Sequence, residues 1–102
     1  MSQSRGNKPV RLTPKACEDL EEIWVYTAST WSVDQAERYT NQIIDAFDAL
    51  AASPERATDV SDLRDGYLRW SIGRHYIFFR DLGDAFEIVR ILHQSRDHDR
   101  HV

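Results

Sequence analysis

The side chains that could take part in chemistry gather in the last third of the chain and are mostly arginine and histidine. Cleavage of RNA needs a base for the 2′-hydroxyl, an acid for the leaving oxygen and cations for the phosphate. A surface rich in arginine, tyrosine and histidine could supply these functions. The candidates are Arg69, Arg74, Tyr76, Arg80, Arg90, His93, Arg96 and Asp97, with His75, His98 and His101 as further histidines.

Metal binding and covalent catalysis are weaker interpretations of the sequence. His98 and His101 lie three residues apart, but no cysteine or carboxylate array with zinc spacing accompanies them, so we expect no metal site. Cys17 has no histidine or aspartate at a helical spacing suited to activating it, and we interpret it as a structural thiol. Because the chain has no glycine-rich phosphate loop, we expect no cofactor.

Three of the candidates have alternative interpretations. His75 falls on the core face of a predicted strand, which favours a hydrogen-bonded structural histidine. Arg90 stands in an otherwise apolar strand, where an unpaired charge would be costly. It either bonds an acid and backbone carbonyls or presents its head at a functional surface. His93 ends the same strand, close to where residues 95–97 are expected to fold back.

Residues 67–80 are predicted to form the β-hairpin that positions most of these groups. Gly73 is the first central residue of a two-residue turn, where a type II′ turn requires positive φ. Pairing across this turn places one apolar face toward a core. The opposite face is expected to be an aromatic and cationic surface. It carries Tyr67, Arg69, Ser71, Tyr76, Phe78 and Arg80.

The last predicted strand, residues 85–93, has an ambiguous register. A two-residue loop would place Phe86, Ile88 and Arg90 on the core face, whereas a three-residue loop with a bulge would place Val89 and Ile91 there. Since both alternations are apolar, we expect a central strand that is buried on both sides.

The N-terminal half is predicted to contain a short strand and two helices. Residues 9–13 alternate as a strand, and Thr13 and Pro14 then begin a helix. A capping box that starts at Ser32 begins a second helix, which ends before Pro54. Because the connection between the helices is so short, they must form an antiparallel hairpin. The expected core includes the three tryptophans, Trp24, Trp31 and Trp70.

These elements predict an α+β fold in the order β-α-α-β-β-β. The antiparallel helical hairpin packs on one face of a mainly antiparallel sheet. Residues 55–66 are polar and without periodicity, and we interpret them as an irregular connection. We expect a single domain over residues 9–102, preceded by a flexible lead-in over residues 1–8.

Charge is distributed unevenly along the chain. Residues 14–62 carry eleven acids against three bases, a balance of −8, within a net charge of −4. This balance disfavours direct, specific binding of nucleic acid as the main activity. The apolar runs are too short for a membrane span, and the single cysteine suits a reducing compartment, so we expect a cytoplasmic protein that does not bind membranes.

The segment GRHYIFFR at residues 73–80, followed by EIVRILH at 87–93, resembles the ParE branch of the ParE/RelE toxin superfamily. The resemblance runs from about Leu12 to the end of the chain. It implies a toxin of a type II toxin–antitoxin system that binds and inhibits DNA gyrase, with roles in plasmid stabilisation or stress response. The family pattern that follows His93-Gln94 is Arg-Met-Asp, and here Ser95-Arg96-Asp97 stands instead. The alternatives are a RelE-type, ribosome-dependent mRNA endoribonuclease and a degenerate, non-toxic binding member.

The resemblance also implies partners and places the candidate residues. The partners are DNA gyrase and a ParD-like or related antitoxin, the latter in a hetero-oligomer. An antitoxin segment that folds on binding would contact the helical hairpin and an exposed sheet edge. Its candidate contacts are Glu18, Glu21, Glu22 and Val25. Toxicity is expected to depend on residues 90–101, with Arg90, His93, Arg96 and Asp97 as first candidates and the hairpin surface as the alternative.

Overall fold

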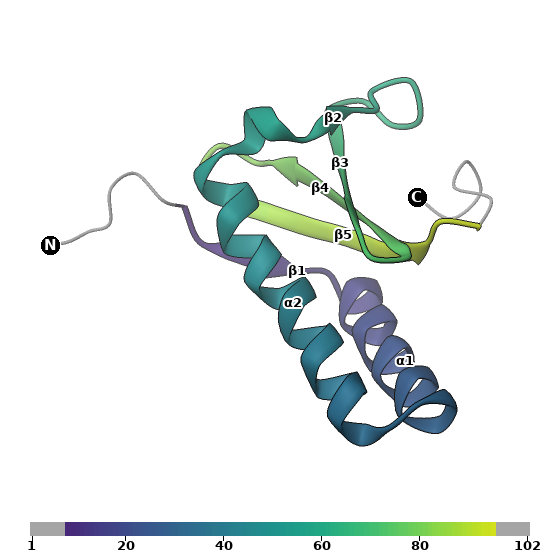
Figure 1. Ribbon diagram of the computed structural model, residues 1–102. Helices are drawn as coiled ribbons and strands as arrows, with labels where there is room; N and C mark the ends of the chain where they lie inside the picture. Colours follow the sequence, from purple (N-terminus) through teal and green to yellow (C-terminus); the bar gives the residue numbers. More distant parts are fainter. Residues whose placement is uncertain (1–7, 96–102) are drawn as a thin grey trace, which may run out of the picture.

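The computed structural model describes residues 8–95, and it places two helices on one face of a five-stranded sheet (Figure 1). The predicted α+β class and the helical hairpin on a mainly antiparallel sheet are confirmed. The elements are β1 (Val10–Leu12), α1 (Pro14–Thr30), α2 (Val33–Ala52), a 3₁₀ turn η1 (Pro54–Arg56), β2 (Thr58–Asp59), β3 (Tyr67–Ile72), β4 (His75–Asp81) and β5 (Phe86–His93). The expected lead-in lies outside the described residues except for Lys8, whose ammonium group is 2.7 Å from the Asp81 carboxylate.

The helical hairpin forms because both helices have side-chain caps. Thr13 Oγ1 accepts a hydrogen bond from the Ala16 N–H at 3.0 Å, and Ser32 Oγ accepts one from the Gln35 N–H at 3.0 Å. Trp31 and Ser32 alone separate α1 from α2. The predicted caps and the short connection are therefore confirmed.

The sheet has the strand order β1-β5-β4-β3-β2, with β1 parallel to β5 and the other pairs antiparallel. β5 therefore lies between β1 and β4, as predicted for a strand that is apolar in both alternations. In the β3–β4 hairpin, Ile72 lies opposite His75 and Trp70 opposite Ile77, the register that the predicted two-residue turn at Gly73 and Arg74 requires. Gly73 in the turn has a φ of 55°, a conformation that favours glycine.

A β-bulge resolves the ambiguous register of the last strand. Phe79 pairs with Ile88 whereas Phe78 pairs with Arg90, so Val89 is the extra residue of β5. The core on the helical side consequently contains Phe86 and Ile88 from before the bulge and Ile91 from after it. Each of the two predicted alternations was correct for one part of the strand.

The main core lies between the helical hairpin and the sheet. Its fully buried members include Ala16, Ile43, Ile77, Phe79 and Ile88. The prediction for Trp31 was wrong, because its side chain is 73% exposed at the end of α1. Trp70 packs against this core while partly buried, and Trp24 is also partly buried.

The opposite face of the sheet is less open than the sequence suggested. Phe78, expected on an aromatic and cationic surface, is 0% exposed and packs with Val60 and Leu92. Val60 belongs to the connection over residues 55–66, which was predicted to be irregular. This connection instead contains η1 and β2, and β2 pairs with β3. The segment covers part of the second face because one valine and one leucine, Val60 and Leu63, pack against it.

Neither helix that the structure describes between residues 8 and 95 combines the length and the apolar character needed to span a membrane.

Candidate functional site

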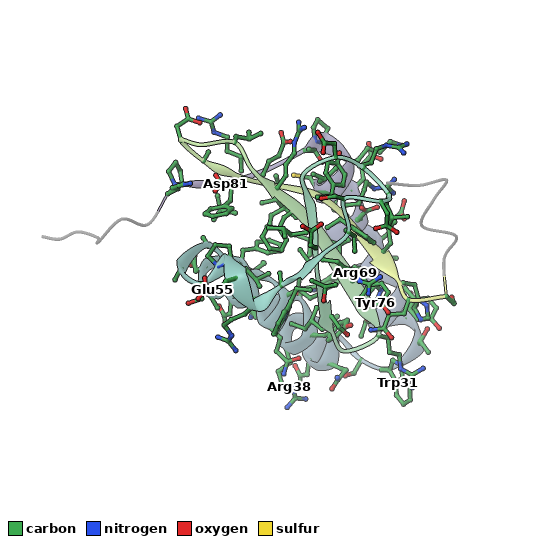
Figure 2. The ribbon with its side chains drawn as sticks, turned by 90° about the horizontal axis from the view of Figure 1, so that it is seen from above. Trp31, Arg38, Glu55, Arg69, Tyr76 and Asp81 are labelled. Atoms are coloured by element: carbon green, nitrogen blue, oxygen red, sulfur yellow. The ribbon has the colours of Figure 1, made fainter. Side chains whose placement is uncertain are left out.

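A groove of about 760 Å³ opens at the end of the sheet where β5 finishes. Its walls are the later turns of α1, the start of α2, the β3–β4 turn and the last residues of β5. Two large aromatic side chains that the sequence analysis did not single out as functional, Tyr26 and Trp31, lie at the groove and are 67% and 73% exposed. Figure 2 shows Trp31 projecting outward at the end of α1. The groove is thus partly apolar, and exposed aromatic groups of this kind are frequent at protein interfaces.

A buried ion pair joins α1 to β5 along one wall of the groove. The Asp19 carboxylate accepts hydrogen bonds from Arg90 Nε at 2.8 Å, from Arg90 Nη2 at 2.9 Å and from the Ile91 N–H at 2.9 Å. The two side chains are 8% and 15% exposed. Hydrogen bonding to Asp19 raises the pKa of Arg90 above its usual value, so the guanidinium stays charged. Of the two alternatives for Arg90, the structure therefore shows pairing with an acid.

Asp19 is a residue that the sequence analysis missed. It lies between Ala16 and Ile23 at helical spacing, so it falls on the buried stripe of α1. This periodicity was the available signal. Because Asp19 stands near the exposed acids Glu18 and Glu21, it resembled another exposed acid.

Tyr39 of α2 ties the helical hairpin to the β3–β4 turn. Its Oη accepts a hydrogen bond from the Arg74 N–H at 3.1 Å and lies 3.2 Å from the Ile72 carbonyl and 2.7 Å from His75 Nδ1. Because the phenol has one proton, it donates to only one of these last two groups. A Cβ on Gly73 would lie 2.5 Å from Tyr39 Oη, so the ring needs glycine at this position.

His75 is held as a structural histidine, as the sequence predicted. Burial, with a smaller contribution from His93, lowers the pKa of His75 to about 4. The imidazole is therefore neutral at pH 7. Burial also raises the pKa of Tyr39, so the phenol keeps its proton.

Gln94, the first residue after β5, is hydrogen-bonded to the β3–β4 turn. The Gln94 N–H donates to the Arg74 carbonyl at 2.9 Å, and Gln94 Nε2 donates to Ser71 Oγ at 2.9 Å and to the Gly73 carbonyl at 3.3 Å. The Ser95 N–H donates to His93 Nδ1 at 3.1 Å. His93 Nδ1 must therefore accept, which places the proton of the neutral ring on Nε2.

The arginines of the hairpin surface lie away from the groove and have partners. The Arg69 guanidinium lies 4.3 Å from the centroid of the Tyr76 ring, and Figure 2 shows the two side chains next to each other. Arg80 Nε lies 2.9 Å from Glu87 Oε1, and its guanidinium lies over the ring of Tyr67.

The candidate residues therefore separate into distinct places. The groove brings together Arg74, His93 and Glu22, with Arg74 exposed on the turn. Val25, Glu18 and Glu21 are exposed on α1. Two toxicity candidates, Arg96 and Asp97, and the tail histidines His98 and His101 lie outside the described residues.

The groups at the groove are suited to contact with a partner. Among residues 8–95, no three His, Cys, Asp or Glu side chains come together as a group that could hold a metal ion. His75 shares its Nδ1 hydrogen bond with Tyr39, and the His93 ring stands edge-on to it at 5.3 Å between centroids. The groups that present themselves to a partner are an exposed arginine, two exposed aromatic rings and an acidic helix face.

Comparison with known proteins gives consistent matches over nearly the whole chain. Residues 10–98 match the family described as the ParE toxin of the type II toxin–antitoxin system parDE. Toxin ParE1 of Mycobacterium tuberculosis (strain CDC 1551 / Oshkosh) is 41% identical over 92 residues, which cover 89% of this chain and 94% of that toxin. Toxin ParE1 of Caulobacter vibrioides is 37% identical over 95 residues, which cover 93% of this chain and 98% of that toxin.

A solved structure, described as the chromosomal ParDE TA system from P. aeruginosa, has the same fold. It aligns with a TM-score of 0.75 at 18% sequence identity, and the alignment covers 85% of this chain and 96% of that one. At this identity, the likeness supports the fold alone.

Proposed function

The chain belongs to the ParE family, the toxins of type II toxin–antitoxin systems, and we propose that it arrests growth by binding and inhibiting DNA gyrase. On this proposal its action is stoichiometric binding of another enzyme and it catalyses no reaction itself. It acts in the cytoplasm, where gyrase works on DNA, and serves plasmid stabilisation or a stress response.

The observation that carries the proposal is the separation of the groups that RNA cleavage would need to bring together. Arg69 and Arg80 are engaged by Tyr76 and Glu87 on the hairpin surface, whereas Arg74 and His93 lie at the groove. A general base and its cations must converge on one phosphate. His75, with its pKa lowered to about 4, is a weak base at pH 7. This arrangement supports a binding surface.

The charge of the chain supports the same proposal. With a net charge of −4, the protein would be repelled by the dense phosphates of a ribosome, where a RelE-type nuclease must work. A protein target places no such demand on the overall charge.

A type II toxin has an antitoxin partner, and we propose that here it is ParD-like and binds the exposed face of α1. Glu18, Glu21 and Glu22 present three carboxylates beside the half-exposed Val25. Such a surface fits a basic, amphipathic segment that folds on binding. Glu21→Lys should weaken antitoxin binding, whereas the matched variant Glu37→Lys, on α2, should not. Equal effects of the two variants would mean that the acids only solvate the helix.

The toxic surface is proposed at the end of the sheet where β5 finishes, and it includes His93. Arg96 and Asp97, which lie outside the described residues, are proposed to be required for toxicity as well. Arg90 contributes to this surface indirectly, because its pairing with Asp19 holds β5 against α1. The hairpin surface with Arg69, Tyr76 and Arg80 remains the alternative location.

Induced expression in bacterial cells tests the proposal. We expect growth arrest with a DNA-damage response, full-length mRNA and continuing translation, and we expect co-expression of the cognate antitoxin to restore growth. Rapid cleavage of mRNA without a DNA-damage response would contradict the proposal and favour the RelE-type endoribonuclease. No growth arrest at equal protein levels would favour a degenerate, non-toxic member.

A further inference from the structure

Arg74 differs from the other described arginines of the sheet in how its backbone is held. Its N–H donates to Tyr39 Oη at 3.1 Å, and its carbonyl accepts from the Gln94 N–H at 2.9 Å. These two partners come from α2 and from the residue that follows β5, so two distant parts of the chain fix one turn residue. The side chain of Arg74 is nevertheless exposed and lies at the groove.

Contacts around the β3–β4 turn restrict the backbone conformational freedom that the tip of a hairpin usually has. The Tyr39 ring packs where a Cβ of residue 73 would stand, and Gly73 has a φ of 55°. Gln94 Nε2 also donates to Ser71 Oγ and to the Gly73 carbonyl. The turn is therefore tied on both sides, through the phenol and through the Gln94 amide.

A rigid backbone under an exposed arginine reduces the entropy lost when that arginine binds. Arginine is also among the residues that contribute most at protein interfaces, since its planar guanidinium can donate two hydrogen bonds to one carboxylate. The exposed aromatic side chains of Tyr26 and Trp31 lie in the same groove.

We propose that Arg74 is a principal contact of the toxin with its protein target, where it pairs with a carboxylate, and that Tyr39 and Gln94 are positioning residues for Arg74. The inference rests on the proposed function in placing the toxic surface at this end of the sheet. It deepens that proposal by assigning one residue, its support and the chemistry of its partner.

The test compares single and double variants by the inducer level that arrests growth and by the toxin concentration that halves gyrase supercoiling. Arg74→Ala should raise both by at least about tenfold, and Arg74→Lys should recover part of the loss. Arg38→Ala is the matched control, because Arg38 is exposed on α2 and outside the groove lining. Figure 2 shows Arg38 pointing away from the body of the protein.

Tyr39→Phe removes one oxygen and keeps the ring, so it should raise both values by about three- to tenfold. Gln94→Glu is isosteric but cannot donate to the Gly73 carbonyl, and it should act in the same way. The control for Gln94→Glu is Gln42→Glu, which makes the same chemical change at an exposed position of α2 outside the groove lining. Melting temperature and antitoxin affinity should stay close to those of the unmodified chain.

Non-additivity separates positioning from a general structural effect. In the Arg74→Ala background, Tyr39→Phe should cause less than about a twofold further loss. A full additional loss would show that Tyr39 acts on stability and would overturn the positioning role. Unchanged growth arrest by Arg74→Ala, or loss of antitoxin binding alone, would overturn the role of Arg74.

Two further outcomes identify the partner. If Arg74→Ala lowers affinity for duplex DNA measured with the toxin alone, the partner is a phosphate and the carboxylate assignment is overturned. If the unmodified chain arrests growth without inhibiting gyrase, the proposed function fails, while the growth-arrest series still decides the role of Arg74.

Discussion

Removing the Asp19 carboxylate is expected to destabilise the protein far more than removing any neighbouring acid on α1. Asp19→Ala deletes the acceptor of three hydrogen bonds, two from Arg90 and one from the Ile91 N–H. It leaves the guanidinium of Arg90, 15% exposed, in a largely buried position without its carboxylate. It also leaves the Ile91 N–H in a part of β5 that is buried.

The magnitude follows from the burial of the pair. Breaking a buried ion pair by removing one partner costs about 3–5 kcal/mol, and the partial exposure of Arg90 favours the lower end, about 3 kcal/mol. For a domain of this size, each kcal/mol lowers the melting temperature by about 4–8 °C. We therefore expect Asp19→Ala to melt about 12–24 °C lower than the unmodified chain.

Thermal and urea unfolding, followed by circular dichroism, give the free energies of unfolding. Glu21→Ala is the control, because Glu21 is an exposed acid on the same helix and should change stability by less than about 0.5 kcal/mol. Asp19→Ala combined with Arg90→Met should cost less than the sum of the single variants, by about 2 kcal/mol, since no unpaired charge then remains. Additive costs, or a cost of Asp19→Ala no larger than that of Glu21→Ala, would refute the structural role of the pair.

Two further predictions concern the core and the pH dependence of stability. Trp70→Ala should cost about 3 kcal/mol in urea unfolding, because Trp70 packs against the main core; a cost below about 1 kcal/mol would contradict this packing. His75 has a pKa of about 4 in the fold against 6.5 in its absence, so the unfolded chain binds more protons between these values. Stability should therefore fall as the pH is lowered from 6.5 to 4, by about 1–2 kcal/mol after allowance for solvent screening. His75→Gln should flatten this part of the pH profile, and an unchanged profile would show that His75 is not the group responsible.

The hairpin and the helical hairpin could be predicted because local residue chemistry determines them. Gly73 allows the positive φ of the turn, and the alternation of the flanking strands then fixes the register. Thr13 and Ser32 cap the helices through contacts within three residues, so the signal is entirely local.

The bulge in β5 could not be predicted from periodicity. Both alternations of residues 86–93 are apolar, and the extra residue, Val89, is selected by contacts distant in sequence. Thr13 supplies two of them, from its N–H to the Ile88 carbonyl at 3.1 Å and from Oγ1 to the Val89 carbonyl at 2.8 Å. These contacts exist only after β1 has paired with β5.

Predictions for isolated apolar residues failed in two opposite ways. Trp31 was expected in the core and is exposed, whereas the segment that contains Val60 was expected to be irregular and Val60 is buried. Trp31 continues the apolar stripe of α1, but the helix ends there, and nothing covers the ring along the part of the chain that the structure describes. Val60 and Leu63 are the large apolar residues of an otherwise polar segment, and β2 has only two residues, too few for a periodic pattern. In each case the burial depends on where the chain turns, which single residues do not reveal.

The candidate site could be predicted in part. Arg74 and His93 were both candidates, and both line the groove, because the turn and the end of β5 lie at adjacent strand ends. Asp19, the partner of Arg90, lies 71 residues away in the sequence. Among the acids of α1, it resembled one more surface carboxylate. The role of Tyr39 was hidden because a tyrosine on an apolar helix stripe predicts core packing and does not identify a hydrogen-bond partner.

The most direct test of the central claim is the effect of the purified chain on DNA supercoiling by purified gyrase, with ribosomes and mRNA assayed in parallel. We predict dose-dependent inhibition of supercoiling that is reversed by adding the cognate antitoxin, together with mRNA that stays intact on translating ribosomes. Full gyrase activity at a saturating concentration of the folded toxin, accompanied by cleavage of ribosome-bound mRNA, would contradict the account.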